Sequence, residues 1–223
     1  MKLLKLLFLV IFSIPASAQI QIGADIDGPS PYAGSGESVS LSSNGTILAI
    51  GAPRQWPTSG SGHVRIHEYS SGSWSQIGVD IDGEASGDKS GKSVSLSSDG
   101  SIVAIGAPRN DGTANNAGHV RVYEDSSGTW VQLGSDIDGE AFQDNSGESV
   151  SLSSNGAIVA IGAMGNDGNG SESGHVRVYE YSSGSWSQLG SDIDGEAQGD
   201  QSGNSISLSS DGTMLAIGGS NNN

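Results

Sequence analysis

Residues 93–107 read SVSLSSDGSIVAIGA, and they decide the fold because two strand patterns flank one turn signal. Val94 and Leu96 alternate with serines, which is the period-two pattern of a half-buried strand. Residues 102–107 are apolar or small on both faces, as expected of a strand that is covered on both sides. The Asp99-Gly100 pair between them predicts a two-residue hairpin, in which both turn positions take positive φ.

Two further strand patterns follow in the same repeat. Residues 118–124 (GHVRVYE) place Val120 and Val122 on one face and polar or aromatic side chains on the other. Residues 130–137 (WVQLGSDI) predict one continuous fourth strand after a Ser-Ser-Gly turn. Four antiparallel strands, each beside its neighbour in sequence, form a meander of the kind found in a propeller blade.

This pattern recurs along the chain. Asp-Ile-Asp-Gly occurs at 25–28, 80–83, 136–139 and 192–195, and Trp74, Trp130 and Trp186 are spaced by 56 residues. A period of this size indicates propeller blades rather than short solenoid coils. The sequence therefore predicts an all-β fold, a β-propeller-like array of four-stranded antiparallel blades.

The predicted strands do not make up a whole number of four-stranded blades. Three full sets run from about residue 36 to 195, residues 204–218 supply only two strands, and residues 19–26 supply one strand of the fourth type, or about 3.75 blades. Either the terminal strands close a four-bladed ring imperfectly, or the chain is an arc of a larger ring. An arc exposes an edge that invites self-association.

The N-terminal 18 residues have the pattern of a secretory signal. Lys2 and Lys5 precede a short apolar run, and Ala16-Ser17-Ala18 fits a cleavage site. The run is shorter than the roughly 20 apolar residues that span a bilayer, so we predict no membrane anchor. The expected organisation is a signal peptide at 1–18, a repeat domain at 19–223, and secretion.

Charge narrows the choice of partners. The chain has 9 basic and 25 acidic residues, a formal net charge of −16. Removal of Lys2 and Lys5 leaves 7 − 25 = −18 for the predicted mature chain. Such a surface repels nucleic acid, so we predict no nucleic-acid partner. There is no cysteine, so burial and hydrogen bonds must hold the fold without disulfides.

Residues 90–124, SGKSVSLSSDGSIVAIGAPRNDG…GHVRVYE, resemble the FG-GAP repeat of integrin α-subunit propellers. Gly51-Ala52-Pro53 and Gly106-Ala107-Pro108 match its Gly-Ala-Pro motif, whereas the later copies have Gly162-Ala163-Met164 and Gly218-Gly219. Ser-Gly stands in place of Phe-Gly in every copy. The resemblance implies a propeller of about seven blades with a role in extracellular recognition.

The resemblance does not extend to the family's calcium loop. That loop has the form Asp-x-Asp-x-Asp-Gly-x-x-Asp between the first two strands, where this chain has Ser-Ser-Asp-Gly or Ser-Ser-Asn-Gly. No family calcium ligand can therefore be transferred to this sequence.

Another acidic segment is a candidate calcium site. Three copies carry four carboxylates within nine residues, and calcium prefers six to eight oxygen ligands. The candidates are Asp80, Asp82, Glu84, Asp88, Asp136, Asp138, Glu140, Asp144, Asp192, Asp194, Glu196 and Asp200. The alternative, which we favour, is a strand-end turn with solvated acids, because Asp and Gly are ordinary turn formers and glycine stands too early for an EF-hand-type loop.

The sequence gives less support to a histidine metal site or to a catalytic site. His63, His119 and His175 belong to the third strand of separate repeats, so we interpret them as structural polar residues. No Ser-His-Asp combination can be singled out as a catalytic trio. We predict no catalytic residue and no obligatory cofactor.

The leading hypothesis is a secreted, non-enzymatic binding or adhesion module whose ligand is an extracellular protein or glycan. In a meander the long acidic loops at 109–118, 136–147 and 165–174 share one end, where loops most often carry function. The alternatives are a hydrolase-type propeller enzyme with its site on that long-loop face, and a structural fragment that works only when assembled.

Overall fold

The computed structural model describes residues 20–30, 33–54 and 60–222. The predicted signal segment at 1–18 lies outside these residues. Within them all regular structure is β-strand. A search of the same residues finds no helix with the length and apolar character needed to cross a membrane.

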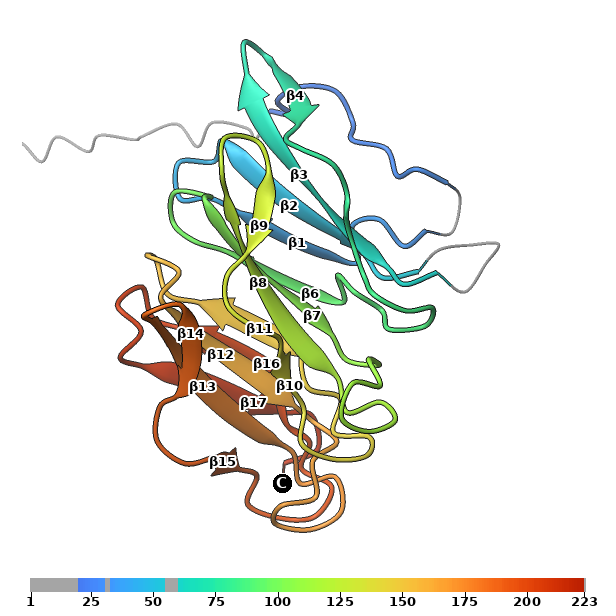
Figure 1. Cartoon of the computed structure of the whole chain (residues 1–223), viewed down its shortest axis with the longest axis vertical. Helices are drawn as coiled ribbons and strands as arrows, with labels where there is room; N and C mark the ends of the chain where they lie inside the picture. Colours follow the sequence, from blue (N-terminus) through green and yellow to red (C-terminus); the bar gives the residue numbers. More distant parts are fainter. Residues whose placement is uncertain (1–19, 31–32, 55–59, 223) are drawn as a thin grey trace, which may run out of the picture.

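The strands form three repeated sheets and a final pair, which we name blades 1 to 4 (Figure 1). Blade 1 contains β1 (Ser38–Leu41), β2 (Ile47–Ala52), β3 (His63–Ser70), β4 (Ser73–Gln76) and β5 (Ile81–Asp82). Blade 2 contains β6 (Ser93–Leu96), β7 (Ile102–Ala107), β8 (His119–Asp125), β9 (Trp130–Gln132) and β10 (Ile137–Asp138). Blade 3 contains β11 (Ser149–Leu152), β12 (Ile158–Ala163), β13 (His175–Ser182), β14 (Ser185–Gln188) and β15 (Ile193–Asp194), and blade 4 contains β16 (Ser202–Leu208) and β17 (Leu215–Gly219).

Each full blade is the predicted antiparallel meander. In blade 2, Ser93 of β6 lies opposite Gly106 of β7, and Ala107 at the end of β7 lies opposite His119 of β8. The all-β prediction and the assignment of the first three strands are confirmed. The alternation of side chains places one apolar set on each face, so every blade has two faces that must be covered.

The fourth strand is not continuous, which corrects the prediction for residues 130–137. β9 pairs with the C-terminal half of β8 and β10 with its N-terminal half, and a turn containing Gly134 (φ 71°) separates them. A Cβ atom on Gly134 would lie 3.0 Å from Trp186 Cδ1 in blade 3. The turn also presents the Leu133 carbonyl, which accepts a hydrogen bond of 2.8 Å from Trp186 Nε1. The strand is broken where the next blade's tryptophan packs.

The hairpin between the first two strands is also longer than predicted. Only the glycine of each Asn-Gly or Asp-Gly pair has positive φ, for example Gly100 at 79°. Asp99 Oδ1 instead accepts hydrogen bonds from Ser97 Oγ (2.7 Å), Ser101 N (3.0 Å) and Ser101 Oγ (2.8 Å). The side chain therefore organises the five-residue loop at 97–101, in the way Asp and Asn stabilise local turns.

The blades pack face to face around their first strands, with β1 against β6, β6 against β11 and β11 against β16. One buried cluster joins Val64, Ile66 and Ile81 of blade 1 to Val103 and Ile105 of blade 2, and a similar cluster joins blades 2 and 3. This radial stacking of meanders is the arrangement of a propeller.

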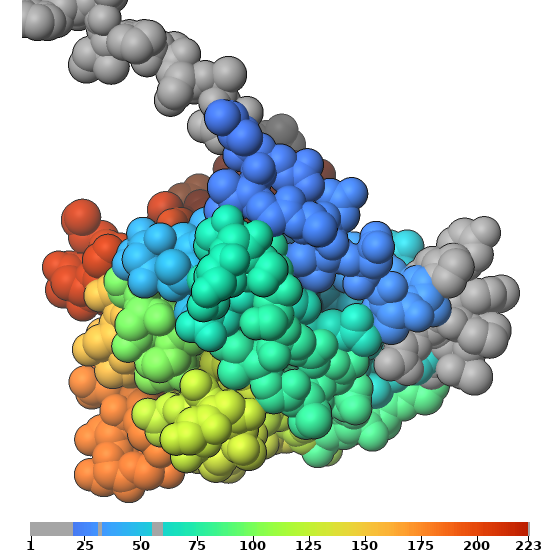
Figure 2. All heavy atoms as spheres, turned by 90° about the horizontal axis from the view of Figure 1, so that it is seen from above, coloured from blue at the N-terminus to red at the C-terminus, as the bar shows by residue number. Residues whose placement is uncertain are grey.

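The propeller is incomplete and unclosed. In the described chain, β16 and β17 pair only with each other. The N-terminal segment at 20–30 lies against blade 1 at the other end of the array (Figure 2). There the Ile22 carbonyl accepts a hydrogen bond of 3.3 Å from Trp74 Nε1, as Leu133 does from Trp186. The segment thus takes the position of a preceding blade's fourth strand, and closure between the terminal strands is not observed.

Candidate functional site

The first aspartate of each candidate calcium segment is held by its own blade. Asp136 accepts hydrogen bonds from Arg121 Nε and Nη2 (3.1 Å each) and from Gln132 Nε2 (2.6 Å). Burial disfavours the ionised form of Asp136, but these hydrogen bonds outweigh it and lower its pKa. Asp80 has the same partners in Arg65 and Gln76.

The last aspartate of each segment caps its own loop. Asp88, Asp144 and Asp200 are buried, and each accepts a hydrogen bond from the backbone N–H three residues earlier, at 3.0, 2.9 and 2.7 Å. The middle aspartates, Asp82, Asp138 and Asp194, are exposed at the strand ends. The three aspartates of one segment therefore do not converge on one point.

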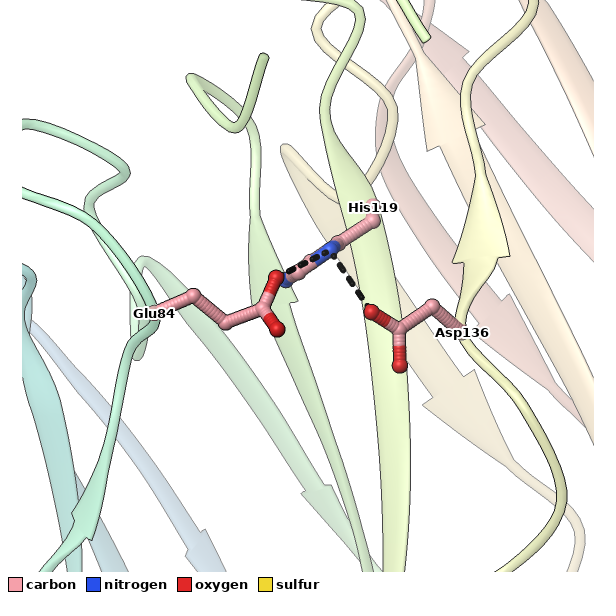
Figure 3. Close-up of side chains that lie close together, drawn as sticks. All are labelled: Glu84, His119 and Asp136. Carbon is pink, nitrogen blue, oxygen red and sulfur yellow. Dashed lines mark ion pairs between the residues drawn. The ribbon is translucent and has the colours of Figure 1, made fainter. Parts of the chain in front are cut away.

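The glutamate reaches the next blade instead. Glu84, from the loop after β5, meets His119 on β8 and Asp136 before β10 (Figure 3). His119 Nδ1 lies 4.0 Å from a Glu84 oxygen and 3.5 Å from Asp136 Oδ2. Its side chain is only 3% exposed, and Nδ1 has no hydrogen-bond partner among the described residues. Burial lowers the pKa of His119, against the raising effect of Asp136, so the ring is neutral at pH 7.

The same arrangement recurs between blades 2 and 3, where Glu140, His175 and Asp192 come together. One histidine and two carboxylates can bind a divalent metal such as zinc. In the first cluster, however, the Arg121 guanidinium already contacts both Glu84 and Asp136. In the second, Arg177 Nη1 lies 3.3 Å from Glu140. In the first cluster the arginine thus takes the place of a cation between the two carboxylates, whereas in the second Arg177 pairs with Glu140 and with no second acid of the described cluster. Both clusters link neighbouring blades electrostatically.

A cleft of about 580 Å³ opens among the loops that join β7 to β8, β10 to β11, β12 to β13 and β15 to β16. Its apolar lining comes from Phe142 and Met164. Polar and charged side chains surround them, namely Arg109, Asn116, Gln143, Asn145, Asp167, Ser171, Glu172 and Gln201. The cleft lies at the end predicted for ligand binding, and its lining is mainly polar, with Phe142 and Met164 as its two large apolar side chains.

The third repeat departs from the other repeats at this cleft. Phe142-Gln143 stands where the neighbouring copies have Ser86-Gly87 and Gln198-Gly199. Met164-Gly165 stands where two copies have Pro-Arg, as at Pro108-Arg109. The exchanges place an exposed aromatic ring in the cleft, since Phe142 is 61% exposed. Internal comparison of the repeats shows these exchanges, but the sequence does not show that they adjoin one cleft.

Backbone strain is concentrated at the same place. Among the described residues, nine other than glycine have positive φ, and five of them line the cleft: Asn116, Gln143, Asn145, Glu172 and Gln201. Gln143 (φ 62°) replaces a glycine that has positive φ in both neighbouring copies. A Cβ atom on Gly165 would lie 2.1 Å from the Gln143 backbone carbonyl oxygen, so the two segments approach closely at this point. Asn116 and Glu172 are equivalent positions of the repeat, as are Lys89, Asn145 and Gln201, so only the strain at Gln143 is particular to this cleft.

No family model matches the sequence. No curated protein matches it either.

Solved structures are similar in fold. A Bacteroides uniformis protein assigned as a 6-phosphogluconolactonase is 16% identical with a TM-score of 0.50, over 72% of this chain and 40% of that one. Hydrazine synthase from Kuenenia stuttgartiensis is 13% identical with a TM-score of 0.51, over 82% and 58%. Sqt1 from Saccharomyces cerevisiae is 15% identical with a TM-score of 0.48, over 77% and 39%. The chain spans less than two thirds of the length of each, and the similarity concerns the fold alone.

Proposed function

We propose that this chain is an exported, non-enzymatic binding module that recognises a carbohydrate in the cleft on its long-loop face. The observation that carries the proposal is the local change in the third repeat. Two pairs of exchanges relative to the second repeat, Phe142-Gln143 and Met164-Gly165, converge on one cleft. The resemblance to FG-GAP repeats supports a role in extracellular recognition.

The chemistry of the cleft favours a sugar over other ligands. A sugar ring presents C–H groups on its face and hydroxyls at its edge. The exposed Phe142 ring and the Met164 thioether offer a surface for the C–H face. Carboxylates and amides such as Asp167 and Gln143 can pair with hydroxyls, because both groups accept hydrogen bonds and amides also donate them. Arg109 forms no ion pair with any described residue, so its guanidinium is available to a ligand oxygen.

The proposal requires neither catalysis nor a bound metal. The described histidines lie in the blades and do not line the cleft. The charged groups of the cleft include one arginine and two carboxylates, and we assign them to recognition.

A glycan array probed with the purified chain tests the proposal. The double variant Phe142→Ser with Gln143→Gly restores the residues of the second repeat and relieves a strained position, so it folds. We expect it to lose at least about tenfold in affinity, the effect of removing one well-packed apolar contact. The matched control is Val131→Ser, which changes a half-exposed side chain on β9, far from the cleft loops.

Two results would contradict the proposal. Equal glycan binding by the wild type and the double variant would show that the cleft is not the site. Binding to extracellular proteins, with no binding to any glycan, would show that the ligand is a protein and not a carbohydrate. Mass spectrometry of the retained glycan should show an unchanged molecule, whereas a cleaved product would indicate an enzyme.

A further inference from the structure

The contact between neighbouring blades repeats in the same form three times. The hairpin loops are joined by backbone hydrogen bonds of 2.8 Å, from Ser43 N to Ser98 O, from Ser98 N to Ser154 O and from Ser154 N to Ser210 O. Nearer the middle of each first strand, a serine hydroxyl accepts a bond from the next blade, for example Ser40 Oγ from Leu96 N at 2.9 Å. Each blade thus has a forward face and a rear face that fit each other.

Side-chain packing has the same period. The first isoleucine of the second strand lies on the loop glycine of the next blade, in the pairs Ile47–Gly100, Ile102–Gly156 and Ile158–Gly212. A Cβ atom on each of these glycines would lie 2.5–2.6 Å from its isoleucine. The leucine at the end of the first strand is buried by the preceding blade, as Leu96 and Leu152 show at 8% and 7% exposed.

The rear face of blade 1 lacks its partner within the described chain. Leu41, equivalent to Leu96, is 56% exposed, and Val39, equivalent to Val150, is 61% exposed. The loop glycine Gly45 has only the Leu41 side chain near the position of its Cβ, at 4.0 Å, so no isoleucine covers it. The segment at 20–30 lies by Trp74 and leaves these three residues open.

The forward face of blade 4 lacks its partner in the complementary way. Met214, at the position of Ile47, Ile102 and Ile158, is 72% exposed. Leu189 and Ile193 of blade 3 are also exposed, at 42% and 43%, but for a different reason, because blade 4 has only two described strands and lacks the outer strands that would cover them. Ser210 N, which corresponds to the donor Ser154 N, has no acceptor among the described residues.

We propose that the forward face of blade 4 docks on the rear face of blade 1 of a second copy of this chain, head to tail. The docking continues an interface that the chain already forms three times. Met214 covers Gly45 and Leu41 of the second copy, and Ser210 N donates to the Ser43 carbonyl. The joined faces are different patches, so the interface is heterologous, and two copies close a ring if the rotation allows it.

Charge is compatible with this pairing. Within the chain, Lys92 lies between Glu37 and Glu148, at 3.2 and 3.4 Å, so the residue before the first strand alternates in sign from blade to blade. The equivalent residue of blade 4 is Asn204, which is neutral. Glu37 of a second copy therefore meets no like charge there. The large negative charge of both copies does oppose association, so salt should strengthen it.

Complementation between two variants tests the proposal. Val39→Asp disables the rear face and Met214→Asp disables the forward face, and both side chains are exposed, so the monomer remains folded. We expect the wild-type chain, expressed from its full coding sequence, to form dimers or larger species by light scattering in moderate salt. Each variant alone should associate at least about tenfold more weakly, as expected for a charge placed in an apolar contact. An equal mixture of the two should recover one-to-one dimers, because each supplies the face that the other lacks.

The controls separate this interface from others. Val131→Asp changes a similarly exposed valine on β9 and should leave the assembly unchanged. Circular dichroism confirms that every variant is folded. A wild-type chain that stays monomeric at all concentrations and salt levels would overturn the proposal. Assembly that survives both variants, or variants that fail to complement each other, would overturn it as well, because the contact would then be elsewhere or between identical faces.

Discussion

At the residue scale, short polar side chains replace backbone partners in the turns of every blade. Asp99 and Asp211 occupy the positions that Asn44 and Asn155 occupy in the other repeats. Asn44 Oδ1 accepts the same three hydrogen bonds as Asp99, from Ser42 Oγ (2.9 Å), Thr46 N (3.0 Å) and Thr46 Oγ1 (2.8 Å). The same turn position is thus occupied by a carboxylate in two repeats and by an amide in the other two.

This comparison predicts how Asp99 responds to substitution and pH. Asp99→Asn should leave stability at pH 7 nearly unchanged, and Asp99→Ala should cost about 1–2 kcal/mol through lost turn bonds. The hydrogen bond from Ser101 N lowers the pKa of Asp99 most, with a further contribution from Ser97. Its stabilisation is therefore complete above the unfolded-state pKa, about 4, and is lost as pH falls through the lower folded-state pKa.

Chemical denaturation between about pH 7 and 3 checks this prediction, because wild type and Asp99→Asn are compared at each pH. The free energy of unfolding of Asp99→Asn should rise relative to that of the wild type as pH decreases. A constant difference across the range would show that the carboxylate charge plays no part in the turn. Asp211, whose pKa is lowered to about 2, should behave in the same way.

Arg121 offers a second prediction, concerning metal ions. We expect calcium and zinc to change the wild-type melting temperature by less than about 1 °C, because the guanidinium already neutralises Glu84 and Asp136. Arg121→Ala frees both carboxylates beside His119, and zinc should then raise the melting temperature of that variant.

Arg65→Ala is the matched control, since Arg65 pairs with Asp80 but Pro29 replaces the glutamate of that cluster. It should gain no response to zinc. A rise in the melting temperature of the wild type with calcium would support the candidate calcium site in the acidic segments. Stabilisation of neither arginine variant would show that the three ligands cannot converge on an ion.

At the element scale, the strands were predictable where their cause is local. The alternation of Val94 and Leu96 with serines predicts β6, and the apolar run at 102–107 predicts β7. The Trp186 contact with the turn between β9 and β10 was not predictable from residues 130–137, because it comes from the next repeat. For the same reason, the acids looked like one local set, whereas Glu84 pairs with residues that lie 35 and 37 positions further along the chain.

Within a blade, the second strand requires a glycine where the next blade approaches it, and this requirement can be tested. A Cβ atom on Gly106 would lie 2.0 Å from the Gly147 carbonyl oxygen of blade 3. Gly106→Ala should therefore cost about 3 kcal/mol or more, since backbone cannot yield as a side chain does. Gly218 is the equivalent residue of blade 4, and its Cβ would meet only Ser205 atoms. Gly218→Ala should cost less than about 1 kcal/mol.

Urea denaturation at concentrations where the chain is monomeric checks the pair. The expected order is a large loss for Gly106→Ala and a small one for Gly218→Ala. Equal losses would indicate that the cost comes from the strand itself and not from the neighbouring blade.

At the scale of the whole molecule, the number of blades was correctly estimated from the repeat, but closure was not decided. Counting strands left two possibilities, an imperfect four-bladed ring or an arc. The structure shows the arc, with the segment at 20–30 at one end and β17 at the other. Closure depends on the rotation between blades, which follows from the volumes of packed side chains and has no signature in a single repeat.

The tryptophan contact also bears on how such a gene can grow. Trp130 donates to the Ile77 carbonyl of the blade before it, and Trp186 donates to the Leu133 carbonyl, so each of these full repeats carries a tryptophan that bonds to the preceding blade and a turn that can accept one from the next. A stretch of 56 codons copied in tandem would bring both parts with it, whatever its starting point. Recombination can therefore lengthen or shorten the array without creating a new kind of junction. The number of blades can then change while the contact between neighbouring blades stays the same.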